Sequence, residues 1–147
     1  MHEEIVAVTP EVEDDENEAI EVVTPATYYL KNGKHYIVYE EVVEGTSGVI
    51  KNRIKINGDE CVEIVKSGLS NSHMILEKNK KNQTFYKTPY GQMLIGVNTR
   101  HLQVDFEEDK IAVQIDYELD VNHEPMADCK IRMNIVSKDS GKFSVLS

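Results

Sequence analysis

Apolar and polar residues alternate with a period of two along most of the chain, and no stretch shows the 3.6-residue period of an amphipathic helix. The clearest run is 110–121, where the odd-numbered residues from Ile111 to Val121 are apolar or aromatic. Such a run predicts a strand with one face in the core and one in water. The pattern predicts about eight to ten strands, with some neighbours merging, near 3–9, 19–30, 34–43, 48–57, 60–66, 72–78, 83–88, 92–99, 101–107, 110–121 and 128–137.

Short turn signals separate these segments. Asn32-Gly33 and Asn57-Gly58 join neighbouring runs, and both dipeptides accept the positive φ that a type I′ hairpin turn requires. Many strands joined by short turns predict an antiparallel meander. A meander of this length usually closes into a barrel, because closure removes the unpaired edges. We therefore expect an all-β fold, an antiparallel barrel that forms a single domain over residues 1–147.

The segment Thr88-Pro89-Tyr90-Gly91 predicts a turn between two of these strands. Pro89 suits the second position of a type I turn, Gly91 suits the fourth, and Thr88 is held extended because it precedes proline. Tyr90 is then at the tip, where neither burial nor strand pairing requires an aromatic ring. We interpret Tyr90 as a candidate ligand contact.

The negative charge belongs to one end of the chain. The formal net charge is −10, and residues 1–24 contain nine of the 26 acidic residues and no Lys or Arg. The remaining residues are close to neutral and have no concentrated basic face, so nucleic acid is not an expected partner. Residues 10–18 predict an acidic, flexible loop between the first two strands, and residues 138–147 predict a weakly ordered tail. The acidic stretch lacks the spacing and the turn glycine of an EF-hand loop, which argues against a cation site there.

Length and composition predict a soluble cytoplasmic protein. A chain of 147 residues with 40% hydrophobic content can bury a core without disulfides. Cys61 and Cys129 are far apart in the sequence, lie in no metal-ligand spacing and are expected to be reduced. No window is apolar enough to span a bilayer, and acids stand where a signal peptide would carry bases, so no membrane association is expected.

Catalytic motifs are absent from the sequence. The five histidines show no metal-ligand spacing, and no phosphate-binding glycine loop or nucleophile elbow occurs. Cys129 shares the apolar parity of Ile131 and Met133, which indicates core packing rather than nucleophilic catalysis. The sequence therefore predicts no cofactor, no metal and no catalytic residues, and an enzymatic function is not expected.

Polar residues at apolar parity are the candidate binding residues. Asn52, Lys66 and Thr99 lie in register with apolar neighbours, so in a barrel they point inward near strand ends. A buried Lys66 needs a carboxylate partner such as Glu40 or Glu77. Alternatively, the strands twist or bulge and these groups reach solvent at the rim. The apolar parity changes near Arg100, which predicts a bulge or tight turn at residues 98–100. Glu40 and Arg100 are also candidate ligand-binding residues.

The tyrosines give a second set of candidates. Most of the seven suit a half-buried pleated surface and are interpreted as structural. Where two or three converge at an open barrel end, they would form an amphipathic pocket lining. Tyr36, Tyr86 and Tyr90 are therefore added to the candidate ligand-binding residues.

The order of these features resembles the YwiB-like family of bacterial proteins. The chain reads TYYLKNGKHYIVYEE, then EGTSGVIKNRIKI, KSG, FYKTPYG and a long alternating DYELDV. The resemblance covers about residues 5–136 and implies a calycin- or lipocalin-like β-barrel of about eight to ten strands. It implies no activity and no site residues. Lys66 stands where this family commonly has Arg, so a site that needs a bidentate guanidinium is not expected here.

Two functions remain open from the sequence. The first is a non-enzymatic binder of a small molecule in the barrel or at its mouth, since a barrel of this size is wide enough for one small ligand. The second is a protein–protein interaction or assembly module, including a homo-oligomer, that uses an edge strand or the acidic N-terminal arm.

Overall fold

The fold is built from antiparallel strands. The computed structural model describes the backbone of residues 3–13, 20–21, 24–42, 44–69, 71–88 and 91–137, and the side chains of residues 24–42, 44–69, 71–85 and 91–137. These ranges contain no helix. The strands are β1 (Glu3–Glu13), β2 (Ile20–Glu21), β3 (Thr24–Lys31), β4 (Lys34–Val42), β5 (Val49–Asn57), β6 (Cys61–Gly68), β7 (Ser72–Glu77), β8 (Lys81–Thr88), β9 (Gly91–Phe106), β10 (Lys110–Val121) and β11 (Glu124–Ser137).

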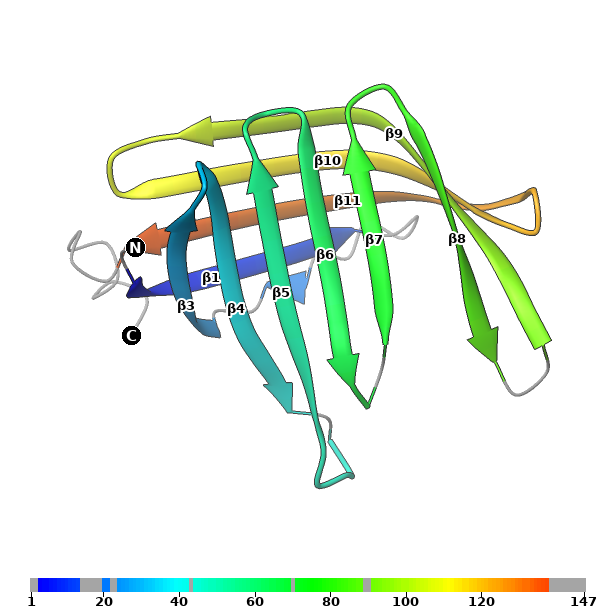
Figure 1. The fold of residues 1–147 in the computed structure, drawn as a ribbon, viewed down its shortest axis with the longest axis horizontal. Coiled ribbons are helices and arrows are strands. Elements are labelled where there is room, and N and C mark those ends of the chain that lie inside the picture. The colour runs from blue at the N-terminus through cyan, green and yellow to red at the C-terminus, as the bar shows by residue number, and fades with distance from the viewer. Residues whose placement is uncertain are drawn as a thin grey trace.

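The strands form one hydrogen-bonded path that folds into two layers. The order is β7-β6-β5-β4-β3-β1-β11-β10-β9-β8, with β2 paired to β1. In Figure 1, β3 to β7 form one layer, and β1 with β9 to β11 form the other, whose strands cross behind the first. The path passes from one layer to the other between β3 and β1. The predicted all-β antiparallel fold is confirmed, and the resemblance to a meander is close, since most neighbours in space are neighbours in sequence.

The predicted closure into a barrel is wrong for the described residues. The two ends of the path, β7 and β8, follow each other in the chain and make contact, but no ladder joins them. Figure 1 shows them diverging from their shared turn. The reason is that β8 pairs with β9 along its whole length, from Lys81↔Asn98 to Thr88↔Gly91, and β9 carries it away from β7. We refer to this unpaired junction as the β7–β8 seam.

The core lies between the two layers. Ile37, Ile56 and Val62 of the first layer are fully buried, and Val113 and Ile115 of the second are 1% exposed. These residues occupy the apolar positions of the alternating runs, so the predicted division into a core face and a solvent face is confirmed.

The predicted bulge is also confirmed. Asp116 pairs with His101 and Tyr117 pairs with Thr99, which leaves Arg100 as the extra residue on β9. The bulge joins the predicted segments 92–99 and 101–107 into the single strand β9, because one unpaired residue absorbs the change of parity.

The turns agree only partly with the sequence. Asn32 and Gly33 have φ of 53° and 75°, as a type I′ turn requires. Of the Asn57-Gly58 dipeptide only Gly58 has positive φ, and Asn57 pairs with Cys61, so the type I′ prediction is wrong there and the connection is longer. Thr88 pairs directly with Gly91, as expected for a turn through Pro89 and Tyr90, two residues outside the described ones.

The predicted loop at 10–18 begins too early. Residues 10–13 belong to β1, where Pro10 pairs with Met133. On its other side β1 changes partner here, from β3 at Val8 to β2 at Glu11. Pro10 has no amide hydrogen to donate, and proline is tolerated at such a break in a ladder. Residues 14–18 and the predicted tail 138–147 lie outside the described residues.

Candidate functional site

A cavity of about 270 Å³ lies where the β3–β4 hairpin of one layer meets the β9–β10 turn of the other. Tyr28 and His35 reach it from the hairpin, and their Oη and Nδ1 atoms are 2.6 Å apart. The His35 ring also lies 4.9 Å from the Phe106 ring, centroid to centroid. The lining residues are Tyr28, His35, Phe106, Glu107, Glu108, Asp109, Lys110, Ile111, Ile135 and Ser137.

The local sequence explains why these groups meet. The tight turn at Asn32-Gly33 places Leu30 opposite His35 and Tyr28 opposite Ile37, so Tyr28 and His35 share the inner face of the hairpin. On the other layer, the turn at 107–110 is closed by a backbone bond from Glu107 N to Lys110 O. The cavity therefore combines aromatic and apolar side chains with the polar side chains of the 107–110 turn, which we call its rim.

The electrostatics of the cavity favour a neutral histidine and a positive ligand group. Burial lowers the pKa of His35 below its usual 6.5, so its imidazole is neutral at pH 7. A neutral ring with its proton on Nε2 accepts the Tyr28 hydroxyl proton at Nδ1. The rim contains three carboxylates against the single ammonium of Lys110, and it therefore carries net negative charge.

A polar cluster lies at the opposite end of the inner face of β4. The Asn52 Nδ2 atom donates to Glu41 Oε1 at 2.6 Å, and Lys66 Nζ donates to the same oxygen at 3.2 Å. Asn52 is fully buried on the inner face, as its apolar parity predicted, whereas the Lys66 side chain is 37% exposed and reaches solvent, the alternative that the sequence left open. The predicted partner of Lys66 is wrong: it is Glu41, because Glu40 is on the exposed outer face and Glu77 pairs with Lys80.

Thr99 and Arg100 lie in the other layer, away from this cluster. Thr99 faces the core and is 1% exposed, and its Oγ1 has no hydrogen-bond partner among the described residues. Arg100 is exposed at the bulge and pairs with Glu118 on the adjacent strand. The first candidate is therefore an interior residue and the second a surface residue.

The candidate tyrosines do not line a common site in the described structure. Tyr36 is on the outer face of the β3–β4 hairpin, where its ring stacks on Tyr29 with centroids 4.9 Å apart. The side chains of Tyr86 and Tyr90 lie outside the described ones. Tyr28, which does line the cavity, was not among the candidate residues predicted from the sequence.

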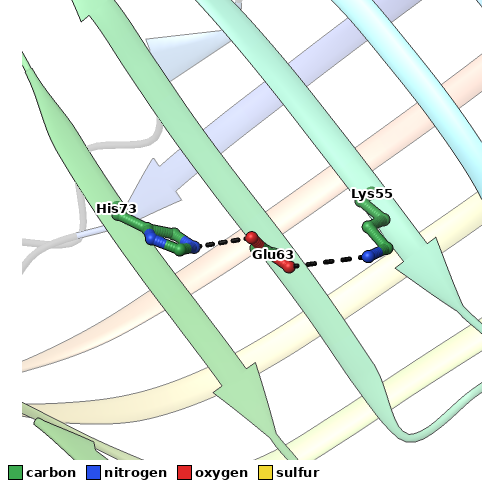
Figure 2. A network of polar contacts seen from close by, with 3 residues as sticks. All are labelled: Lys55, Glu63 and His73. Carbon is green, nitrogen blue, oxygen red and sulfur yellow. Dashed lines mark hydrogen bonds and ion pairs between the residues drawn. The ribbon is translucent and has the colours of Figure 1, made fainter.

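The outer face of the first layer holds a separate polar network. Figure 2 shows Glu63 on β6 between His73 Nε2 at 2.6 Å and Lys55 Nζ at 4.0 Å. These residues form cross-strand pairs on a solvated face. Among the described residues, no group of three or more His, Cys, Asp or Glu side chains is arranged to hold a metal ion.

The cysteines show no features of a nucleophile. Burial raises the pKa of the Cys61 thiol, and Glu77 and Glu63 raise it further, so the thiolate is disfavoured. Cys129 is half-buried and packs against the core, as its apolar parity predicted. The described part of the chain also contains no helix long and apolar enough to cross a membrane.

The Tyr28–His35 pair is what sequence reasoning missed. The alternation gives both residues to the inner face of one hairpin, so their contact follows from the Asn32-Gly33 turn. The cavity does not follow, because its other wall comes from Phe106 and the 107–110 turn, far away in the sequence.

Comparison with known proteins assigns the family. Residues 5–133 match a family model described as a domain of unknown function, DUF1934. The chain is 31% identical over 114 residues to the "uncharacterized beta-barrel protein YwiB" of Bacillus subtilis (strain 168), an alignment that covers 77% of this chain and 78% of the relative. The crystal structure of the ywiB protein from Bacillus subtilis superposes with a TM-score of 0.74 and 23% sequence identity over 92% of both chains, which supports the fold. The chain therefore belongs to the DUF1934 family.

Proposed function

We propose that the protein binds a small organic molecule in the cavity between the β3–β4 hairpin and the β9–β10 turn, without catalysing a reaction on it. The observation that carries the proposal is the cavity itself, which combines an aromatic and apolar lining with the hydrogen-bonded Tyr28–His35 pair. A concave, largely apolar site with a few convergent polar groups and a histidine of shifted pKa is the usual form of a small-molecule site.

The cavity also restricts the ligand. Its volume of about 270 Å³ is just below the range of roughly 300–1,000 Å³ typical of drug-sized ligands, so the ligand is small. Phe106 and the His35 ring offer an apolar and aromatic contact surface, and the carboxylates of Glu107, Glu108 and Asp109 attract positive charge. The favoured ligand class is a compact aromatic or aliphatic amine. The proposal does not require a closed, calycin-like barrel, because the cavity lies away from the β7–β8 seam.

A matched series of ligands tests the proposal. Phenethylamine, 3-phenylpropionate and 3-phenylpropanol share an aromatic ring on a short chain and differ in charge, so calorimetric titration with each separates shape from charge. We expect the amine to bind most tightly and the carboxylate least. Phe106→Ala and His35→Ala should weaken amine binding at least tenfold, whereas Tyr36→Phe, on the outer face of the same hairpin, should leave it unchanged. Equal binding of the three ligands, or binding that survives both cavity variants, would refute the proposal.

The β7–β8 seam favours a second candidate function, self-assembly by strand addition. The seam leaves β7 and β8 without a ladder partner on one side, and unpaired edges pair readily with other chains. Light scattering from a size-exclusion column over a hundredfold range of concentration tests it. A monomer at every concentration rejects self-association. Replacing Asp14, Asp15, Glu16 and Glu18 by the corresponding amides tests whether the charge of the acidic arm contributes to assembly. These substitutions lie outside β1, whereas a deletion of residues 10–18 would remove part of that strand.

A further inference from the structure

A row of polar side chains crosses the inner face of the first layer, where apolar residues are expected. Asn52 pairs with Lys66, and Lys66 pairs with Ser72, so three adjacent strands contribute one polar residue each. Glu41 on β4 completes the row through its contacts with Asn52 and Lys66. We call these four residues the polar shelf. Its residues belong to the last part of β4 and of β6 and to the first part of β5 and of β7, and these are the strand ends that point downward in Figure 1.

One buried atom of the polar shelf has no hydrogen-bond partner among the described residues. Asn52 is 0% exposed, and its amide nitrogen is fixed by Glu41, so the amide oxygen is the remaining group. That oxygen, Oδ1, makes no hydrogen bond within the described residues. More than about 90% of buried polar atoms in proteins are hydrogen-bonded, so an unpaired acceptor beside an ion pair indicates a position that a ligand donor can occupy.

The polar shelf can be reached from solvent. The side chains of Lys66 and Glu41 are 37% and 42% exposed, although Asn52 beneath them is closed off. Lys66 is a long, unbranched side chain held by a single ion pair at 3.2 Å, so it can turn outward without breaking any part of the sheet. Because Lys66 is directly opposite Asn52 on the neighbouring strand, this movement opens the side of Asn52 that faces β6.

The chemistry of the polar shelf selects a neutral ligand rich in hydroxyl groups. Glu41 and Lys66 balance each other in charge, so an added cation meets the ammonium and an added anion meets the carboxylate. Asn52 Oδ1 and the second Glu41 oxygen accept hydrogen bonds, while Lys66 donates them. A hydroxyl group both donates and accepts, and therefore matches all three.

We propose that the polar shelf is a second binding site, which takes a small polyol or monosaccharide. It is distinct from the amine cavity, since His35 and Glu41 lie six residues apart on one strand, or about 20 Å at the usual rise per residue. The two sites therefore load independently.

Nuclear magnetic resonance titration tests the site, with the side-chain amide of Asn52 as the reporter. Xylitol, pentylamine and pentanoate have five carbons each and differ in hydroxyl content and charge. We expect xylitol to shift the Asn52 amide signal with saturation in the millimolar range, and the two ions to leave it unchanged. Lys66→Met should weaken xylitol binding at least threefold, and Ser67→Ala, on the exposed face beside it, should have no effect.

Asn52→Leu completes the test and keeps the two sites apart. The variant should lose xylitol binding at least tenfold, followed through the Ser72 backbone signal, while phenethylamine binding at the cavity stays as in the wild type. Should the variant fail to fold, Lys66→Met alone decides the outcome. Xylitol shifts that never saturate, or that persist in the variants, would overturn the proposal, whatever the result at the amine cavity.

Discussion

Asn52 tests the energetic cost of a buried, unpaired polar atom in the interior, because Asn52→Leu should stabilise the protein. Leucine has the same number and branching of heavy atoms as asparagine. A buried unpaired carbonyl costs about 1–3 kcal/mol, and the replacement removes that cost. It also removes a hydrogen bond to the Glu41 carboxylate, a type that contributes about 1.5–3 kcal/mol.

The lost hydrogen bond to Glu41 is largely replaced, so the net change in the free energy of unfolding is stabilising. The Glu41 side chain is 42% exposed and keeps its contact with Lys66, so water replaces the lost amide. Two methyl groups buried in place of polar atoms add about 0.8 kcal/mol each at full burial. We expect a net gain of about 1 kcal/mol in the free energy of unfolding, or about 2–4 °C in melting temperature for a chain of this size.

Urea denaturation and calorimetry measure this effect, with two companion variants. Thr99→Val removes another buried unpaired oxygen and should also stabilise, by about 1 kcal/mol. Asn52→Asp keeps the shape but places a second carboxylate against Glu41, and should destabilise at pH 7 and less so near pH 4. Destabilisation by more than about 1 kcal/mol in both Asn52→Leu and Thr99→Val would show that these oxygens are already satisfied.

Three further predictions concern other parts of the molecule. Because burial lowers the pKa of His35, the unfolded chain binds more protons than the folded one as the pH falls below 6.5, and the free energy of unfolding should fall with the pH. His35→Gln should reduce this pH dependence, as measured by urea denaturation at pH 5.5 and 7.5. Burial, and secondarily Glu41, raises the pKa of Tyr39 to about 12; Glu41→Gln should lower it only part of the way toward 10, as read from phenolate absorbance against a Tyr39→Phe reference. Gly68→Ala should destabilise by about 1–3 kcal/mol, since φ is +110° and the new Cβ would lie 2.5 Å from Val49 O, whereas Gly33→Ala meets no atom within 4 Å and should suffer only the strain of its positive φ.

Alternation predicted most of the strands and the inward direction of the key residues. Asn52 and Lys66 were identified because they break the apolar parity of their strands, and parity is a local property. The bulge at Arg100 was found in the same way, since a change of parity must be absorbed somewhere. The choice between Glu40 and Glu41 needed only the parity of β4, on which Ile37 and Tyr39 face the core.

Properties that depend on two layers could not be predicted in this way. The cavity needs Phe106 to meet His35, and no pattern within either segment sets that distance. The predicted barrel closure was wrong for a related reason. Unpaired edges are unfavourable, but this does not determine where β9 bends, and that bend separates β8 from β7 (Figure 1).

The position of β1 between β3 and β11 determines the order in which a newly made chain can assemble. The other ladders join strands that follow each other in the sequence, apart from β1–β3, which skips only the two-residue β2, so they can form as the ribosome delivers them. The β1–β11 ladder cannot, because β11 follows all the other strands of the described residues. Until then no ladder joins β8, β9 and β10 to the rest of the sheet, and their inner face is exposed to chaperones and to other nascent chains. A chain that ends before residue 124 would therefore lack the strand that links β10 to β1.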